Sequence, residues 1–261
     1  MARTVTNAFP FALFMWLATT LAGSVPVDAV LAQAREHLGG DAVLNGIESI
    51  RYEGTFFNRP DGTGGRFIIT LQKPGQQRTE FNDGRLTTIT ATDGVVGWNR
   101  VSDNRDPDRY DLRGLSPKEH RRLRYNTHDN LYFYSRMDRV DGEVEYEKRT
   151  IQDGFPAHKL AFYFDDELVF HRFIDVQDGS VIATRNPDGV TVREFGNMWV
   201  DGMRFPRRVI AYLDGEEATR LEYERIVLNE SYPDSFFEFP TIEPRSLRSP
   251  DEELGSREEG S

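Results

Sequence analysis

The dipeptide Asp-Gly recurs through this sequence and limits how the chain can fold more than any other feature. It occurs nine times, beginning at Asp61, Asp83, Asp93, Asp141, Asp153, Asp178, Asp188, Asp201 and Asp214. Asp and Gly both tolerate the positive φ that a tight two-residue hairpin turn requires, so Asp-Gly between β-rich segments predicts a hairpin. The chain is therefore expected to form an antiparallel meander.

The spacing of these turns predicts how many strands the meander has. From Asp141 onward the spacings are 12, 25, 10, 13 and 13 residues, and Asp165-Asp166 divides the long gap with another plausible turn. About seven strands follow in this half, and five more are expected near residues 50–58, 66–73, 78–81, 86–91 and 95–98. A twisted sheet of eleven or twelve strands curls, and a barrel, a half-barrel or a second sheet would bury one of its faces.

Three helices are predicted between the strands. Residues 27–38 have apolar positions at helical spacing and end at Gly39-Gly40, and a short helix is expected over 41–47. The third is predicted over 116–139, where Ser116 as N-cap, Pro117 and Glu119 form a capping box. Its later part includes Leu131 and Phe133 and should pack on an apolar surface.

The two ends of the chain differ from the middle. Residues 1–24 carry Arg3, an apolar run of about 13 residues and then small residues, the pattern of a secretory signal peptide; a membrane span needs about 20. Residues 243–261 are rich in Pro, Ser and acids, and we expect a disordered acidic tail. One domain is thus predicted over 25–242, exported and without a stable membrane span.

Composition excludes several classes of function. Lys and Arg number 32 against 43 Asp and Glu, a formal charge of -11, which disfavours nucleic acid and anionic membrane surfaces as partners. The absence of cysteine excludes disulfides, thiolate zinc sites and a lipidated N-terminal Cys.

The turns also predict which side chains share a face of the sheet. Residues that flank a two-residue turn lie opposite one another and point the same way, which pairs Phe162 with Val169 and Leu160 with His171. Carried across the later turns, this predicts one apolar face with Leu160, Phe162, Phe164, Phe173, Ile182, Phe195, Trp199, Ile210, Tyr212, Leu221 and Tyr223. The other face is predicted to be amphipathic and to carry Arg172, Arg207, Arg220, Glu222 and Glu224.

The motifs of common catalytic and metal sites are missing. The five histidines show no His ligand pair at metal spacing, and no GxSxG, P-loop or GxGxxG is present. No catalytic residue, metal or cofactor is therefore predicted. Pairs of carboxylates on neighbouring strands leave a carboxylate-based hydrolase open as an alternative.

Several segments in order resemble the periplasmic carriers of outer-membrane lipoprotein sorting, in the LolA/LolB-like superfamily. The segments are HLGGDAVLNGIESIRYEGTF after the first helix, KPGQQRTEF, DGVVGWNR and the terminal VLNESYPDSFFEFP, which together span about residues 26–240. The resemblance implies an α+β fold that is mainly β: an incomplete antiparallel barrel of about eleven strands with a helical lid over an apolar face. It also implies periplasmic location and lipid or lipoprotein acyl chains as cargo, with envelope donor and acceptor proteins as partners.

The leading hypothesis is a carrier or chaperone that binds acyl chains between the curved sheet and its lid helices. The expected ligand contacts are the apolar residues of the predicted face and of the lid: Leu160, Phe162, Phe164, Phe173, Phe195, Trp199, Tyr212, Tyr223, Leu131 and Phe133. A filled barrel that serves as an envelope scaffold or interaction module remains the other non-enzymatic alternative.

Overall fold

The computed structural model describes residues 26–241, and the predicted signal peptide and acidic tail lie outside this range. The described chain is mainly β with three α-helices and two short 3₁₀ helices. The helices are α1 Val27–Leu38, α2 Asp41–Asn45, α3 Pro117–Tyr132, η1 Met137–Val140 and η2 Asp234–Phe236. None of the described helices is both long and apolar enough to cross a membrane.

Fifteen strands are present. In the first half they are β1 Ser49–Asn58, β2 Thr63–Gln72, β3 Gln76–Asn82, β4 Leu86–Thr92, β5 Gly97–Asp103 and β6 Asp106–Gly114. In the second half they are β7 Gly142–Gln152, β8 Phe155–Phe164, β9 Glu167–Asp175, β10 Val181–Arg185, β11 Thr191–Phe195, β12 Met198–Val200, β13 Met203–Phe205, β14 Arg208–Leu213 and β15 Glu216–Leu228.

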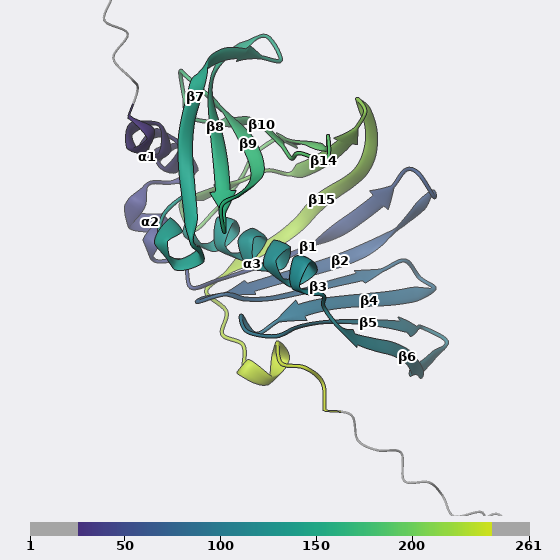
Figure 1. Ribbon diagram of the computed structural model, residues 1–261. Coiled ribbons are helices and arrows are strands. Elements are labelled where there is room, and N and C mark those ends of the chain that lie inside the picture. The colour runs from purple at the N-terminus through teal and green to yellow at the C-terminus, as the bar shows by residue number, and fades with distance from the viewer. Residues whose placement is uncertain (1–25, 242–261) are drawn as a thin grey trace, which may run out of the picture.

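Thirteen of these strands form one antiparallel sheet in the order β6-β5-β4-β3-β2-β1-β15-β14-β11-β10-β9-β8-β7. The sheet curls strongly but does not close, because β6 and β7 are both edge strands (Figure 1). The prediction of an open, mainly β fold is confirmed in this form, with 13 strands in place of about eleven. Strands β12 and β13 form a separate hairpin between β11 and β14.

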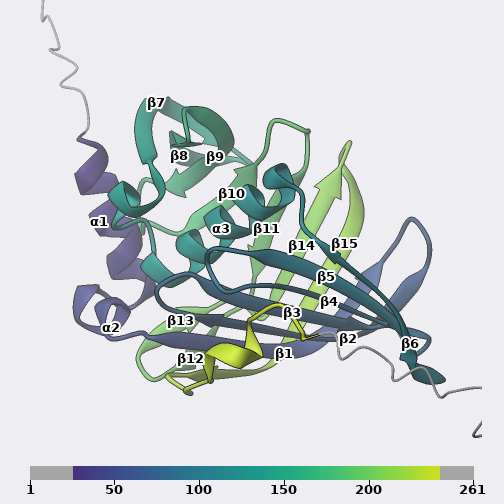
Figure 2. The ribbon, with the colours of Figure 1, turned by 60° about the horizontal axis from the view of Figure 1, so that its bottom comes forward.

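Helix α3 connects the two edges of the sheet. The chain leaves edge strand β6, crosses the concave side as α3 and then enters the opposite edge strand β7 (Figures 1 and 2). The predicted capping box is confirmed, since the Ser116 side chain accepts from the Glu119 N–H and Glu119 accepts from the Ser116 N–H. The helix ends at Tyr132 instead of 139, because Phe133, Tyr134 and Arg136 take left-handed backbone angles.

Seven of the nine Asp-Gly dipeptides form turns of two kinds, and Asp141-Gly142 and Asp188-Gly189 belong to neither. Asp153-Gly154, Asp201-Gly202 and Asp214-Gly215 have positive φ at both residues, as does Asp165-Asp166, so these are the predicted tight turns. At Asp61, Asp83, Asp93 and Asp178 only the glycine has positive φ, and the Asp side chain accepts a backbone N–H two residues later. The second kind makes longer connections. Val95 and Val96, predicted to lie in a strand, fall in the turn after Asp93, whereas residues 106–114, where no strand was predicted, form β6.

The predicted face of the sheet is wrong from β9 to β14, although Leu221 and Tyr223 on β15 do lie on the concave side as predicted. A register shift between Phe162 and Tyr163 pairs Phe162 with Phe170 and Leu160 with Arg172, not with Val169 and His171. This bulge inverts the facing of β9, so Phe173 lies on the convex side and Arg172 on the concave side. A second shift follows between Val181 and Ala183. Phe195, Ile210 and Tyr212 also lie on the convex face, with their register partners Arg208, Arg193 and Thr191.

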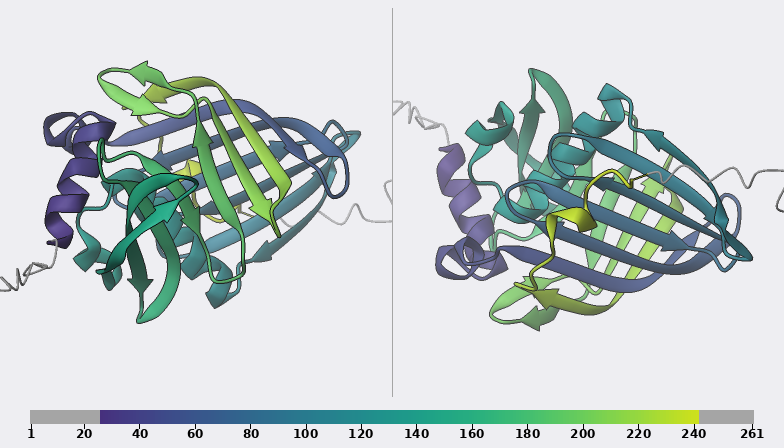
Figure 3. Two further views of the ribbon diagram at one scale, coloured as in Figure 1. Left: turned by 90° about the horizontal axis from the view of Figure 1, so that it is seen from above. Right: turned by 90° about the horizontal axis from the view of Figure 1, so that it is seen from below.

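Two apolar clusters lie on the concave side of the sheet. One joins α2 and the end of α3 to β1, β2 and β13, around Ile50, Phe67 and Leu131. The other packs α1 and α3 on β8 and β9, around Leu160, Phe162 and Phe164. The convex side of β3–β5 is covered by the C-terminal segment with η2, where the Trp98 indole donates to the Phe237 carbonyl over 2.9 Å (Figure 3, right).

Candidate functional site

A row of six aromatic rings crosses the concave face. Neighbouring ring centroids lie between 5.1 and 6.0 Å apart, which is the range of favourable aromatic contacts. In order, the row is Phe56, Phe81, Phe67, Tyr223, Tyr52 and Phe205. Strict alternation on β1 and β2 places Tyr52, Phe56 and Phe67 on this side. Phe56 and Phe81, at one end, are only partly buried, so the row reaches accessible surface.

At its other end the row reaches a cavity of about 320 Å³. The cavity lies between the sheet, α1 and the end of α3, and it is of the size that small-molecule sites have in proteins. Its apolar wall includes Leu38, Tyr52, Phe133, Met203 and Phe205. Its polar wall includes His37, Asp129, Arg172, Glu194 and Arg204. The cavity is therefore amphipathic, and not a purely hydrocarbon-lined space.

Arg172 holds α3 to the second half of the sheet. Two guanidinium nitrogens of Arg172 donate to the two carboxylate oxygens of Asp129 on α3, each over 2.9 Å, and its Nε donates to Thr184. Burial, the largest single cause, lowers the pKa of Arg172, but the charge and hydrogen bonds of Asp129 together with Tyr134 and Glu194 outweigh it, so the pKa is raised. The guanidinium also lies over the rings of Phe162 and Phe170. Arg172 is thus charged and fully engaged.

Polar contacts hold α3 to the rest of the molecule as well. Thr127 donates to the Gln77 amide oxygen of β3 over 2.7 Å, and Asn126 donates to the same oxygen. Arg35 of α1 donates to the carbonyls of Tyr132 and Phe133, the last turn of α3, over 3.0 and 2.7 Å. These bonds satisfy carbonyls that a helix end leaves unpaired. Helix α3 is therefore fastened to both halves of the sheet and to α1.

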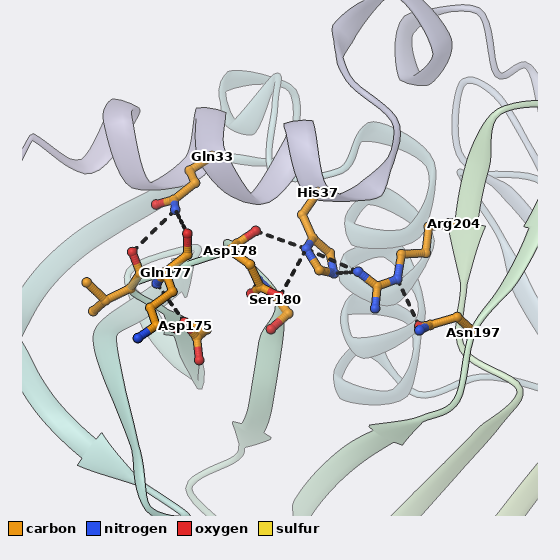
Figure 4. Close-up of polar contacts among 9 residues, drawn as sticks. Gln33, His37, Asp175, Gln177, Asp178, Ser180, Asn197 and Arg204 are labelled. Carbon is orange, nitrogen blue, oxygen red and sulfur yellow. Dashed lines mark hydrogen bonds and ion pairs between the residues drawn. The ribbon is translucent and has the colours of Figure 1, made fainter.

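Helix α1 contributes Ala34, His37 and Leu38 to the wall of the cavity, and Figure 4 shows the polar contacts that hold it in place. Gln33 donates to the carbonyls of Val176 and Gln177 in the β9–β10 turn. The Nδ1 of His37 lies 2.9 Å from the Asp178 carbonyl, and its Nε2 meets a guanidinium nitrogen of Arg204 on β13. Burial lowers the pKa of His37, and the charge of Arg204 lowers it further. A neutral ring fits this geometry, with Nδ1–H donating to the carbonyl and Nε2 accepting from Arg204.

Glu194 is the one carboxylate of the cavity wall without a partner among the described residues. Its side chain projects from β11 on the concave side and stays accessible to water, because it faces the cavity. Although Glu194 is an exposed residue, desolvation by the protein around the carboxyl raises its pKa, and the charge of Arg172 opposes the shift. The hydroxyls of Tyr52 and Tyr223 also form no hydrogen bond within the described chain.

The residues predicted as ligand contacts fall into three groups. Tyr223 belongs to the aromatic row, and Phe133 lines the cavity. Leu131 of α3 is 0% exposed against β1 and β2, and Leu160, Phe162 and Phe164 of β8 are 0% exposed beneath α1 and α3, all on the concave side. The structure does not bring the remaining four to this site: Phe173, Phe195 and Tyr212 lie on the convex face, and Trp199 on β12 is 63% exposed.

Sequence reasoning missed most of the residues at the centre of this site. Alternation in β1 and β2 was a signal that could have found Tyr52, Phe56 and Phe67. Arg172 was predicted to lie on the amphipathic face, and Glu194 was not singled out, because a charged residue on a strand ordinarily marks the solvent side. No signal in the sequence distinguishes a charge that faces an internal cavity from one that faces bulk water.

Other hollows are less suited to an apolar ligand. A groove of about 730 Å³ beside α2 and the end of α3 is lined by charged residues that include Lys73, Arg136 and Arg139. A third hollow of about 330 Å³ lies between the start of α3 and β4–β5. Within residues 26–241 no group of three or more His, Cys, Asp or Glu is placed to hold a metal ion.

Comparisons with known proteins agree with this architecture. No protein-family model matches the sequence, and no curated protein matches it. Among solved structures, the fold is similar to a LolA superfamily protein from Nitrosomonas europaea, with a TM-score of 0.54 and 16% identity over 82% of this chain and 98% of that one. A domain from Vibrio parahaemolyticus described as a candidate outer-membrane lipoprotein-sorting domain gives 0.52 and 9% over 80% and 96%.

A third similar structure is a DUF1329 family protein from Desulfovibrio piger. It has a TM-score of 0.53 and 10% identity, over 82% of this chain and 97% of that chain. At these identities the likeness concerns the course of the backbone and not the side chains of the site. The described chain therefore shares its fold with these three structures, one of them a LolA superfamily protein, which agrees with the fold that the resemblance of its segments implied.

Proposed function

We propose that this protein is a carrier or chaperone of the cell envelope that binds the acyl chain of a lipid, a lipoprotein or another amphiphile on its concave face. One observation carries the proposal: the aromatic row leads from accessible surface at Phe56 and Phe81 into a cavity of about 320 Å³ beneath α3. Phe67, Tyr52 and Phe205 are only 1%, 8% and 3% exposed, so a hydrocarbon chain would lie along the row and leave water only as the helices move away from the sheet. The names of the similar structures, a LolA superfamily protein and a lipoprotein-sorting domain, favour the same role.

The magnitudes allow reversible binding. Each methylene removed from water contributes about 0.8 kcal/mol, so ten of them contribute about 8 kcal/mol before the costs of association are subtracted. Those costs amount to several kcal/mol, which leaves binding weak enough for release to an acceptor. No step of such carriage needs a catalytic residue. Periplasmic location and donor and acceptor proteins are part of this proposal.

Helices α1 and α3 serve as the lid in this proposal. Tyr223 and Phe133 would contact the ligand in the present arrangement, since one lies in the row and the other lines the cavity. Leu131, Leu160, Phe162 and Phe164 are fully covered, so they would join the site only if α1 and α3 lift. The polar contacts through Gln77, Asp129 and Arg35 would then separate and later form again.

A pair of neighbouring phenylalanines on β1 tests the proposal. Phe56 lies in the aromatic row, whereas Phe57 points to the convex side and is 43% exposed. The delipidated full chain is titrated with a fluorescent long-chain fatty acid. Phe56→Ser should weaken binding roughly tenfold to hundredfold, since a large apolar contact is worth about 1.5–3 kcal/mol. The matched variant Phe57→Ser should bind within about twofold of wild type.

A filled barrel with a scaffold or interaction role is the second candidate. It is favoured by the two packed clusters that occupy much of the concave side, in which Leu160, Phe162 and Phe164 are 0% exposed. The titration separates the two. If wild type binds no amphiphile, or if Phe56→Ser and Phe57→Ser have equal effects, the carrier proposal is wrong and the filled barrel stands.

A further inference from the structure

A polar row crosses the concave face on strands β3 to β6. The register joins one residue of each strand to the next, and residues that lie opposite one another point to the same side of the sheet. They are Thr79, Thr90, Asn99 and Arg113. This side is the concave one, because Phe81 lies two residues from Thr79 on β3 and belongs to the aromatic row. The concave face therefore changes from aromatic on β1 and β2 to polar on β4 to β6.

The polar row meets the start of α3 at the hollow of about 330 Å³. Thr90 and Asn99 line this hollow from the sheet, and Leu123 lines it from the helix. Phe81, at the accessible end of the aromatic row, pairs with Thr88 on β4, two residues from Thr90 on the same face. Neighbouring strands lie about 4.8 Å apart, so the hollow is next to that end of the aromatic row. One amphiphile could therefore occupy both.

The charged residues that line the hollow leave one guanidinium without a carboxylate. Arg113 donates to both carboxylate oxygens of Glu119 over 3.1 and 2.9 Å, and Glu119 also accepts from Ser116. Arg122, the third charged residue of the lining, forms no ion pair and no side-chain hydrogen bond within residues 26–241. Its side chain is exposed to the solvent that fills the hollow, and its guanidinium carries five N–H donors. The group left to bind a ligand is therefore positive.

The helix around Arg122 is positively charged as well. The first half of α3 has one carboxylate, Glu119, against four cations: Lys118, Arg121, Arg122 and Arg124. Asp111 on β6 acts on Arg113 and does not line the hollow. The chain as a whole is negative, but charges farther away than about 8 Å are largely screened at physiological salt. The electrostatic potential at the hollow is therefore set by these cations.

From this arrangement we infer that the hollow binds the anionic headgroup of an amphiphile, a carboxylate or a phosphate, with Arg122 as its counter-ion. A guanidinium can donate two parallel bonds to either group. The Thr90 hydroxyl accepts from Asn99 over 2.9 Å, which leaves its own proton for the headgroup. The apolar chain of the ligand lies along the aromatic row. The inference rests on the proposed function and adds to it the charge and the place of the cargo's headgroup.

Three amphiphiles with the same ten-carbon chain test the inference, each titrated calorimetrically into the full chain below its critical micelle concentration. Decanoate and decyl phosphate carry the two anionic headgroups, and decyl maltoside is uncharged. Arg122→Gln should weaken binding of at least one anion by about threefold to tenfold, because it removes the counter-ion. Binding of decyl maltoside should stay within about twofold of wild type. A loss for decanoate alone identifies a carboxylate headgroup, and a loss for decyl phosphate alone identifies a phosphate.

The matched control is Arg121→Gln, which removes the same charge from the same helix. Arg121 precedes Arg122, points about 100° away around the helix axis and does not line the hollow. This variant should leave all three affinities within about twofold of wild type. Neither arginine forms an ion pair in the described chain, so both variants should fold, and their thermal unfolding midpoints check this.

The outcomes separate the inference from the proposed function. If Arg122→Gln weakens neither anion, if it weakens decyl maltoside equally, or if Arg121→Gln has the same effect, the headgroup site is wrong while amphiphile carriage stands. If none of the three probes binds wild type, carriage itself fails and the headgroup site fails with it.

Discussion

At the scale of single residues, a buried ion pair joins helix α3 to the sheet. Arg172 and Asp129 form a pair whose side chains are 9% and 18% exposed, and Glu194 faces the same cavity alone. Buried ion pairs seldom add net stability compared with apolar residues, but removal of one partner is costly. Their value here is positional, because the pair fixes where α3 lies on the sheet.

Substitution of Asp129 should therefore destabilise the protein strongly. Asp129→Ala leaves the Arg172 guanidinium buried without its counter-ion, and we expect a loss of about 3–5 kcal/mol in the free energy of unfolding. Chemical denaturation measures this. The double variant Asp129→Ala, Arg172→Met should recover much of the loss, since it removes both charges. Asp138→Ala, whose side chain is 74% exposed, should change stability by about 0.5 kcal/mol or less.

The histidines should make the free energy of unfolding depend on pH, and the direction of their pKa shifts determines the sign of that dependence. Burial, the largest cause, lowers the pKa of His37, and it does the same for His128 and His158. A group whose folded pKa is lowered binds fewer protons in the folded state than in the unfolded one. The free energy of unfolding should thus be level above about pH 7 and fall as pH drops below the ordinary value of 6.5.

Unfolding at a series of pH values between 8 and 5 measures this slope. His37→Gln should make the slope shallower, because one of the contributing groups is gone. An unchanged slope in that variant would show that His37 has the same pKa in the folded and the unfolded state.

At the scale of elements, glycine determines how the two halves of the sheet join. Strand β1 pairs with β15 along the whole seam, with a register shift between Glu53 and Gly54. A Cβ at Gly54 would lie 2.0 Å from the Glu222 carbonyl oxygen and 3.0 Å from the Phe67 ring. The backbones approach so closely there that only glycine fits.

Gly54→Ala should therefore weaken the seam. We expect a loss of about 1–3 kcal/mol or more in the free energy of unfolding, the usual cost of overpacking, because the nearest atom belongs to the backbone and cannot move aside. Gly75→Ala is the matched control, since a Cβ at Gly75 would meet nothing within 4 Å. Equal effects of the two substitutions would contradict the close approach.

The helices and strands were easier to predict from the sequence than the side of the sheet to which each side chain points. The bounds 27–38 of α1 and the capping box of α3 could be predicted because they depend on local propensity and local hydrogen bonds. The faces of β9 to β14 could not, since the shifts near Phe162 and Val181 depend on contacts between strands. Site residues that depend on which side of the sheet they face are therefore mispredicted even where the strand itself is predicted. Phe173, Phe195 and Tyr212 were predicted as site residues, whereas Tyr52 and Glu194 were not.

At the scale of the whole molecule, loading a ligand under α3 requires the helix to move relative to the sheet. The bond from Thr127 to Gln77 joins α3 to β3, and the absence of cysteine lets a pair of introduced thiols react alone. Thr127→Cys with Gln77→Cys, oxidised to a disulfide with a copper–phenanthroline reagent, should slow binding of a fluorescent fatty acid by at least about tenfold, because the two side chains are in direct contact. Stopped-flow fluorescence measures the rate.

Each single-cysteine variant treated with the same reagent serves as the control and should bind at the wild-type rate. An unchanged rate in the linked double variant would show that ligands reach the concave face without displacement of α3.

The passage of the chain from β6 through α3 to β7 restricts what that displacement can be. A flap hinged at one end can swing clear of what it covers, but a segment tethered to both rims of the sheet cannot. Helix α3 can only move outward from the sheet or change the distance between edge strands β6 and β7. The distance of α3 from the sheet and the separation of the two edge strands therefore change together. A partner protein that pried β6 away from β7 would thus reshape the binding site without touching it.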